Sequence, residues 1–255
     1  MKDETRIGGP SGKFPATRWS AVVAARSDDP RERRRALGCI VSAYWKPIYK
    51  YLRIRWNKSN EDAKDVTQDF FTQLIDKEYL SDFDPAKSRL RTFLRVCVDH
   101  FVANQTKAAK RLKRGGDVAH LSFDFDSAEA EFVRAKSPLT ASAPSESFDD
   151  FLEKEFVRNL FTLAVADVRR FCEERSKQLH FRLFERYDLD DDGARRPSYS
   201  EMAREFSIAV TDVTNHLAFA RREFRRIALE RLREITCSEA EFRREARALL
   251  GVDPK

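Results

Sequence analysis

Four carboxylates are grouped in the segment NEDAKDVTQDFFTQL, which begins at Asn60: those of Glu61, Asp62, Asp65 and Asp69. Grouped carboxylates can hold Mg²⁺ for phosphodiester cleavage. In this segment, however, apolar residues recur at helical spacing, and the acids at 61, 65 and 69 repeat every four residues. They would form a row along one exposed helix edge, about 6 Å apart, and not a convergent pocket. Such a row suits a positively charged protein partner and repels DNA, unless it is merely a solvated helix face.

No other residue pattern indicates catalysis or a cofactor. The four histidines are scattered, at positions 100, 120, 180 and 216, and the sequence has neither an HExxH motif nor a Gly-rich phosphate loop. No Ser or Cys is placed beside a base, and the four cysteines are too far apart for a CxxC metal site or a disulfide framework. We therefore predict that the chain is not an enzyme and has no catalytic residues, no metal site and no cofactor.

One segment begins like a calcium-binding loop. In DLDDDGARRPSY, the correct early positions are held by Asp188, Asp190, Asp192 and Gly193. The twelfth position holds Tyr199 where a bidentate Glu is needed, and Arg and Pro residues replace oxygen ligands. An acidic surface loop is the better interpretation.

The composition indicates which elements must position these residues. The chain has 255 residues, enough for one or two domains with a real core, and 42% of them are hydrophobic. Twenty Phe and only eight Gly favour helices over turn-rich β structure. No apolar run approaches the length of a membrane span, and the first residues lack the apolar core of a signal peptide. We expect an all-α protein that is soluble and cytoplasmic, with no membrane partner.

The net charge of +6 is unevenly distributed. Residues 87–114 carry nine Lys or Arg against one acid, residues 117–155 carry ten acids against three bases, and residues 221–234 carry six Arg against three Glu. Basic blocks of this size are typical of contacts with nucleic-acid phosphate, although charge runs also simply solvate helix faces.

The helices predict two domains. Ser59 or Asn60 is a suitable N-cap for the acidic helix, and an amphipathic helix before it should kink or restart at Pro47. The inner face of the acidic helix would be Ala63, Val66, Phe70 and Leu74.

We place a flexible N-terminus at 1–16, a first helical domain at 17–115, an acidic and partly irregular linker at 116–149, a second domain at 150–235 and a C-terminal extension at 236–255.

The second domain ends in a pattern typical of a helix-turn-helix. The segment SYSEMAREFSIAVTDVTNHLAFARREFRRIALERL predicts a short helix, a tight turn and a longer helix that ends in arginines. Ala203 lies where two crossing helices need a small side chain. Ile208 and Val213 would fill the angle between the helices.

Over roughly residues 17–115 and 150–235 the chain resembles the extracytoplasmic-function group of bacterial RNA polymerase sigma factors. The resemblance is carried, in order and spacing, by AYWKPIYKYLRIRW, NEDAKDVTQDFFTQL, FDPAKSRLRTFLRVCVDHFVANQTKAAKRLKRG and YSEMAREFSIAVTDVTNHLAFARREFRRI. The stretch EDAKDVTQDFF is its most specific part. TRWSAVVAA and FRREARALLGV are similar to a longer subgroup with a C-terminal extension. The resemblance implies a factor that binds core RNA polymerase, directs it to promoters and helps to open the DNA.

The resemblance assigns the acidic helix to the main contact with a basic coiled coil of the polymerase clamp. The matching positions are Asp62, Asp65, Gln68 and Asp69. An acidic row on a basic protein fits this role, provided that apolar or polar anchors lie beside the charges.

The resemblance also implies two sets of contacts with promoter DNA. In the basic helix, Arg91, His100, Asn104 and Gln105 could meet bases, and the phosphate contacts would be Lys107, Lys110, Arg111, Lys113 and Arg114. In the helix-turn-helix, the candidate base contacts are Thr211, Asp212, Thr214, Asn215 and His216, with Arg221, Arg222 and Arg225 on the backbone. Position 100 holds His where many relatives have Asn. Relatives usually carry Lys or Arg at 214 and 216, and the acid at 212 would approach phosphate unfavourably.

The acidic linker has two interpretations. By resemblance, LSFDFDSAEAE would occupy a basic channel of the polymerase, with its acids mimicking phosphate. Alternatively, Phe123 and Phe125 pack back onto one of the domains. For the whole chain, a free-standing helix-turn-helix regulator or a degenerate sigma-like adaptor is the alternative to a sigma factor. The sequence leaves open the promoter sequence and whether an anti-sigma factor or another regulator binds the chain.

Overall fold

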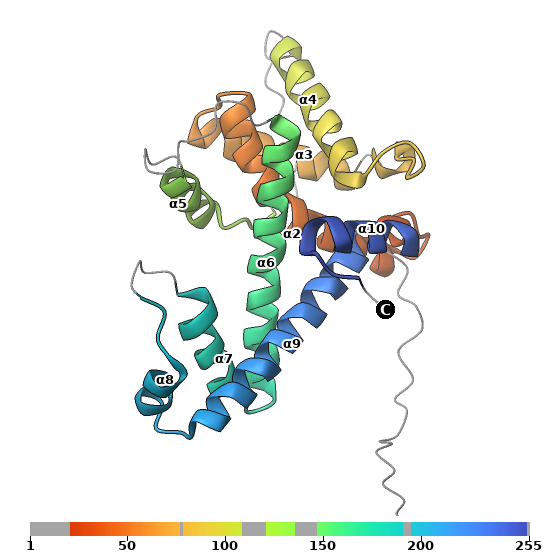
Figure 1. The fold of residues 1–255 in the computed structure, drawn as a ribbon. Coiled ribbons are helices and arrows are strands. Elements are labelled where there is room, and N and C mark those ends of the chain that lie inside the picture. Colours follow the sequence, from red (N-terminus) through yellow and green to blue (C-terminus); the bar gives the residue numbers. More distant parts are fainter. Residues whose placement is uncertain (1–20, 77–78, 109–120, 136–146, 191–194, 254–255) are drawn as a thin grey trace, which may run out of the picture.

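The computed structural model describes residues 21–76, 79–108, 121–135, 147–190 and 195–253. Within these ranges the chain forms helices and no strand, which confirms the predicted all-α class (Figure 1). The predicted flexible N-terminus at 1–16 lies outside them. The elements are α1 (Ala21–Ala24), α2 (Pro30–Arg55), α3 (Asn60–Asp76), η1 (Tyr79–Asp82), α4 (Leu90–Ala108), α5 (Phe125–Ala135), α6 (Phe148–Glu174), α7 (Gln178–Phe184), η2 (Glu185–Leu189), α8 (Tyr199–Glu205), α9 (Val210–Glu234) and α10 (Glu239–Leu250).

Helix α2 continues through Pro47 because another helix satisfies the backbone group that this proline leaves free. Proline has no N–H, so the carbonyl of Ala43, four residues earlier, loses its helical donor. The buried amide of Asn159 on α6 donates to that carbonyl at 2.9 Å and to the carbonyl of Ser42 at 3.0 Å. Of the two predicted outcomes at Pro47, a kink or a restart, the structure excludes the restart, because α2 is a single helix of 26 residues.

We expect Asn159→Leu to lower the free energy of unfolding by about 1–3 kcal/mol, since the Ala43 carbonyl would be buried without a donor. Urea denaturation measures the change. Pro47→Ala provides the matched control, because it restores the amide N–H that bonds the same carbonyl within α2. In the double variant, Asn159→Leu should cost much less than it does alone. An equal cost in both backgrounds would contradict this account of the Asn159 amide.

The first core is built on α2. Its large buried side chains include Tyr49 and Leu52 of α2, Phe70 of α3 and Leu94 of α4. All four predicted inner residues of α3 are buried in it, which confirms the helical face expected from the sequence. The C-terminal helix α10 also packs here, through Phe242 and Ala246.

The second core contains the helix-turn-helix. Ala203 of α8 and Val213 of α9 are buried, and Ile208 in the turn packs against them, as predicted from their spacing. Helix α8 begins at a capping box formed by Ser198 and Glu201. The Ser198 hydroxyl accepts from the Glu201 backbone amide at 3.2 Å, and the Glu201 carboxylate accepts from the Ser198 backbone amide at 2.6 Å.

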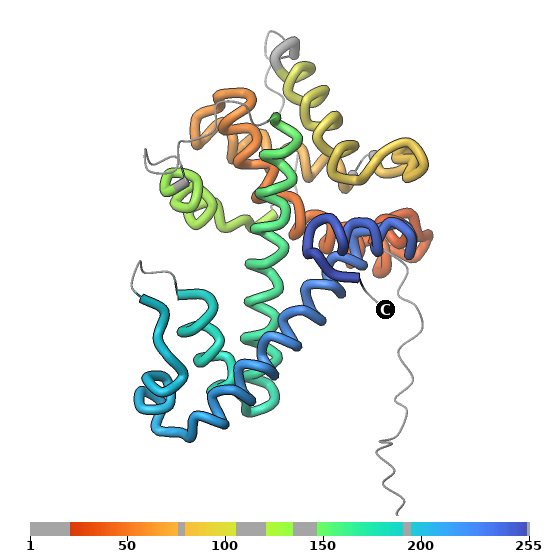
Figure 2. The backbone as a smooth tube through the Cα atoms, in the orientation of Figure 1, coloured from red at the N-terminus to blue at the C-terminus, as the bar shows by residue number. Residues whose placement is uncertain are grey.

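Helices α6 and α9 join the two cores. The first half of α6 supplies Leu152 and Phe156 to the first core, and its second half supplies Val168 and Cys172 to the second. Helix α9 runs back beside α6, so that Leu232 near its end lies in the first core (Figures 1 and 2). The first core therefore extends beyond the predicted domain limits at residues 115 and 150.

Candidate functional surfaces

The acidic edge of α3, defined by Asp62, Asp65 and Asp69, is exposed. The Ser59 hydroxyl caps the helix by accepting from the Asp62 amide at 3.1 Å, which confirms one of the two predicted N-caps. The opposite face of α3 is buried in the first core, so rotation of the helix cannot hide the edge. Gln68 is half-buried beside the edge, and its amide donates to the Leu121 carbonyl at 3.3 Å.

Asp69 joins the acidic edge to α4. Its carboxylate accepts from the Gln105 amide at 3.2 Å. Partial desolvation raises the pKa of Asp69; the bond from Gln105 opposes this rise, and the neighbouring Asp65 carboxylate adds to it. Folding therefore disfavours the ionised form of the Asp69 carboxyl group.

We expect Asp69→Asn to raise the unfolding temperature slightly at pH 7. A folded-state pKa above the unfolded value destabilises the fold at pH values above the folded pKa, and this penalty disappears as the pH falls towards the unfolded value of about 3.9. The gain from Asp69→Asn should therefore fade on acidification. Asp62→Asn is the control with the same charge change, and should be neutral or destabilising because Asp62 lies in the favourable first turn of α3. Calorimetry at a series of pH values between about 3.5 and 7 compares the two variants. A gain that does not depend on pH would contradict the role of ionisation.

Contrary to the prediction, Arg91 is not accessible to a DNA base in this structure. It belongs to an ion-pair network, the Arg91 network, formed by Arg89, Arg91, Glu153 and Glu245. Arg91 donates to Glu245 at 2.5 Å and to Glu153 at 2.6 Å, and its side chain is only 9% exposed. Arg89 Nε lies 3.1 Å from Glu245 Oε1. The network ties the start of α4 to α6 and α10.

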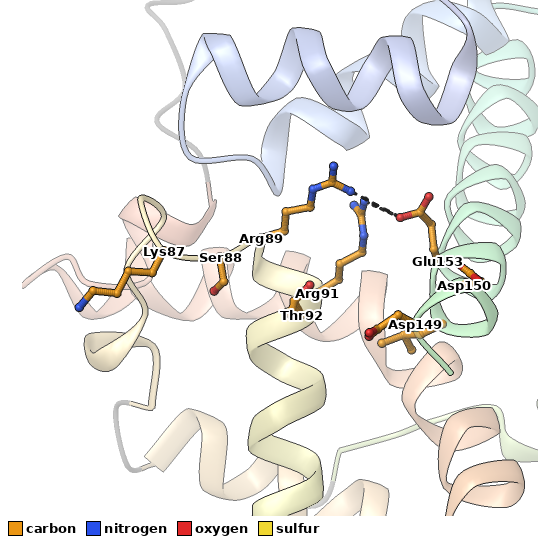
Figure 3. Close-up of a pocket in the computed structure, with 9 residues that line it drawn as sticks. Lys87, Ser88, Arg89, Arg91, Thr92, Asp149, Asp150 and Glu153 are labelled. Carbon is orange, nitrogen blue, oxygen red and sulfur yellow. Dashed lines mark hydrogen bonds and ion pairs between the residues drawn. The ribbon is translucent and has the colours of Figure 1, made fainter. Parts of the chain in front are cut away.

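A pocket of about 360 Å³ lies beside this network, between the start of α4 and the start of α6. Figure 3 shows Arg89 and Arg91 extending from the α4 side towards Glu153 on α6. Because these charged groups already pair with each other, they are not free to bind a ligand in the pocket.

The remaining predicted residues of α4 fall into three groups. His100 and Asn104 are exposed, and Gln105 is bonded to Asp69. The Lys107 side chain lies outside the described part of the chain, as do residues Lys110, Arg111, Lys113 and Arg114. Asp99, beside His100, has a structural role, because it accepts hydrogen bonds from Tyr51, Trp56 and Arg95.

The start of α9 presents Thr211, Asp212, Thr214 and Asn215 to solvent, but His216 is half-buried. Its ring lies 3.9 Å from the ring of His180 on α7, measured between centroids. Burial, the neighbouring His216 and Lys177 lower the pKa of His180 to about 4, so that His180 is neutral at pH 7.

Of the three predicted backbone contacts on α9, Arg222 and Arg225 are exposed, whereas Arg221 is engaged. Arg221 forms two hydrogen bonds with Asp188, at 2.8 and 2.9 Å. Asp188 is the first residue of the segment that begins like a calcium loop, and Arg196 pairs with it at 3.4 Å. Residues 191–194 of that segment lie outside the described ranges. Among described residues, no three His, Cys, Asp or Glu are grouped as metal ligands.

The described part of the acidic linker at 121–135 contains helix α5 and packs onto the first core. Phe123 stacks on Trp45, and Phe125 meets the same ring edge-on. Of the two interpretations of this linker, the structure agrees with packing on a domain. The middle of the linker, around Pro138 and Pro144, was expected to be irregular and lies outside the described residues.

Several residues that form ion pairs or ring contacts in the structure were not predicted from the sequence. Trp45, Lys46, Tyr49, Lys50 and Arg53 recur on one face of α2, a spacing that could have identified a basic and aromatic stripe. The acids Glu153 and Glu245 carry no local signal, since their partner Arg91 is far away in the sequence.

The chain matches no family model, no curated protein and no solved structure. The resemblance to sigma factors therefore stays a prediction from the sequence. Among the helices that the structure describes, none combines the length and apolar character needed to cross a membrane.

Proposed function

We propose that this chain is a sigma-type initiation factor that acts in the cytoplasm, binds core RNA polymerase and helps to open promoter DNA. In this proposal the acidic edge of α3 docks onto a basic coiled coil of the polymerase clamp. The outer face of α4 and the start of α9 meet promoter DNA, and the chain itself performs no catalysis.

The observation that carries the proposal is the exposed acidic edge of α3 on a chain of net charge +6. Desolvation raises the pKa of Asp69, so that its ionised form is disfavoured by the fold, which is consistent with a carboxylate kept for binding. The hydrogen bond from Gln105 places α4 directly beside this edge. A partner bound to α3 would therefore lie close to DNA held by α4.

Purified full-length chain should retain the complete core polymerase in a pull-down assay. Run-off transcription with that complex and a genomic promoter library should then give a defined set of start sites. Failure to retain core polymerase would overturn the proposal.

A sigma-like adaptor is the second candidate, and one observation favours it. Residues 210–220, the first three turns of α9, contain no Lys or Arg, and Arg221 is held by Asp188. DNA contact by the helix-turn-helix would then be weak. Retention of core polymerase without promoter-specific transcripts would select the adaptor.

A further inference from the structure

One face of α2 combines aromatic rings with positive charges. This face, called here the basic-aromatic face, consists of Trp45, Lys46, Tyr49, Lys50 and Arg53. At about 100° per residue, these five positions fall within an arc of about 140° around the helix. The face is covered by residues 121–132, called here the cover segment, which include most of α5.

The cover segment meets each part of this face with a matching group. Phe123 stacks on Trp45, with ring centroids 5.0 Å apart and planes inclined by 14°. Glu131 accepts from Lys46 and Lys50, both at 2.8 Å. Glu129 accepts from the Tyr49 hydroxyl at 2.6 Å and pairs with Arg53 at 3.0 Å. The carboxylates that bind Lys46 and Arg53 therefore both belong to the cover segment.

This set of contacts has the chemistry of a bound single strand. Surfaces that bind single-stranded nucleic acid use aromatic side chains on which bases stack and cations that follow the phosphates. Here a phenyl ring lies where a base would stack on Trp45, and carboxylates lie where phosphates would meet Lys46 and Arg53.

The ion pairs of the contact are weak evidence for a purely structural role, although Ala128 and Phe132 of the cover segment are buried. Lys46 and Lys50 are nearly buried, and a buried ion pair is often no more stabilising than well-packed apolar residues of similar size. If the cover segment leaves, Lys50 keeps a second carboxylate partner, Glu155 at 2.7 Å. Lys46 and Arg53 would lose the carboxylates that the cover segment supplies. A helix of 11 residues is marginally stable in isolation, so α5 should unfold when it detaches from α2.

We propose that the basic-aromatic face of α2 is a binding site for single-stranded nucleic acid, and that the cover segment occupies it as a removable mimic. The site is distinct from the predicted contacts on α4 and α9. It does not rest on the proposed function, because its test needs no polymerase.

The test measures fluorescence anisotropy with a labelled oligo-dT of about ten nucleotides, within the site size of such surfaces. Glu129→Gln/Glu131→Gln should bind the probe at least about tenfold more tightly than wild type, since Lys46 and Arg53 lose their carboxylate partners. Asp124→Asn/Asp126→Asn is the matched control: it removes the same charge from exposed positions of the same segment and should change affinity about twofold or less.

The gain in affinity for oligo-dT should disappear when Trp45→Leu is added to Glu129→Gln/Glu131→Gln, because Leu offers no ring on which a base can stack. A gain equal to that of the control, a gain that persists without Trp45, or an equal gain for duplex DNA would each overturn the proposal.

Hydrogen exchange on the wild-type chain gives an answer even if the double variant does not fold. Saturating oligo-dT should accelerate exchange of the amides of residues 126–132, and unchanged or slower exchange there would overturn the proposal.

Discussion

Asp65→Arg/Asp69→Arg should lower the affinity for core RNA polymerase by at least about 100-fold, equivalent to about 2.7 kcal/mol. Both side chains lie on the exposed acidic edge of α3, so the double variant presents two positive charges to a basic coiled coil. Like charges placed opposite each other at an interface cost several kcal/mol, whereas each native pair at an exposed rim contributes little. The penalty of reversal is therefore larger than the loss obtained by neutralising the same residues.

The reversal should leave the fold intact, with a change in unfolding free energy of about 1 kcal/mol or less, because neither carboxylate belongs to the core. Glu173→Arg/Glu174→Arg makes the same change in net charge at exposed positions near the end of α6, and should retain wild-type affinity. Immobilised core polymerase and circular dichroism give the two measurements. Wild-type retention of polymerase by the Asp65/Asp69 variant would show that α3 is not the docking helix.

Local patterns in the sequence were sufficient to predict α3. Its cap at Ser59 and its buried face depend on residues within three or four positions of one another, and the structure has both. The exposed acidic edge follows directly, because it is the side of the helix opposite the buried face. The helix-turn-helix was predictable for the same reason, since Ala203, Ile208 and Val213 are close together in the chain.

Distant contacts were not predictable. No periodicity indicates that Asn159 would bond the carbonyl freed by Pro47, or that Glu129 and Glu131 would meet cations about 80 positions earlier in the chain. A cation near the start of a basic helix has the same local sequence context whether it faces DNA or a carboxylate from another helix. The resemblance to sigma factors assigned Arg91 to DNA, and the local sequence held nothing to correct it, while the C-terminal helix that holds Arg91 was left without a role.

Arg91→Met should lower the free energy of unfolding by about 3 kcal/mol, because it leaves the carboxylate of Glu245 buried with a weaker set of partners. Glu245 is 1% exposed, so water cannot replace the lost guanidinium. Arg89 still approaches that carboxylate, which is why the expected loss is at the lower end for a broken buried pair. Since the Arg91 network joins α4, α6 and α10, the loss should appear as destabilisation of the whole first core. Urea denaturation measures it.

Two variants separate this structural role from a DNA contact. Arg89→Met removes a side chain that is 40% exposed and should cost about 1 kcal/mol or less. Arg91→Met/Glu245→Met removes both members of the buried pair and should recover most of the stability lost in Arg91→Met, because no unpaired charge is left in the core. If Arg91 instead reads a base, Arg91→Met would keep wild-type stability and weaken promoter binding. In that case Arg91→Met/Glu245→Met would show no recovery of unfolding free energy. The ion pair between Arg91 of α4 and Glu245 of α10 would then not describe the DNA-bound protein.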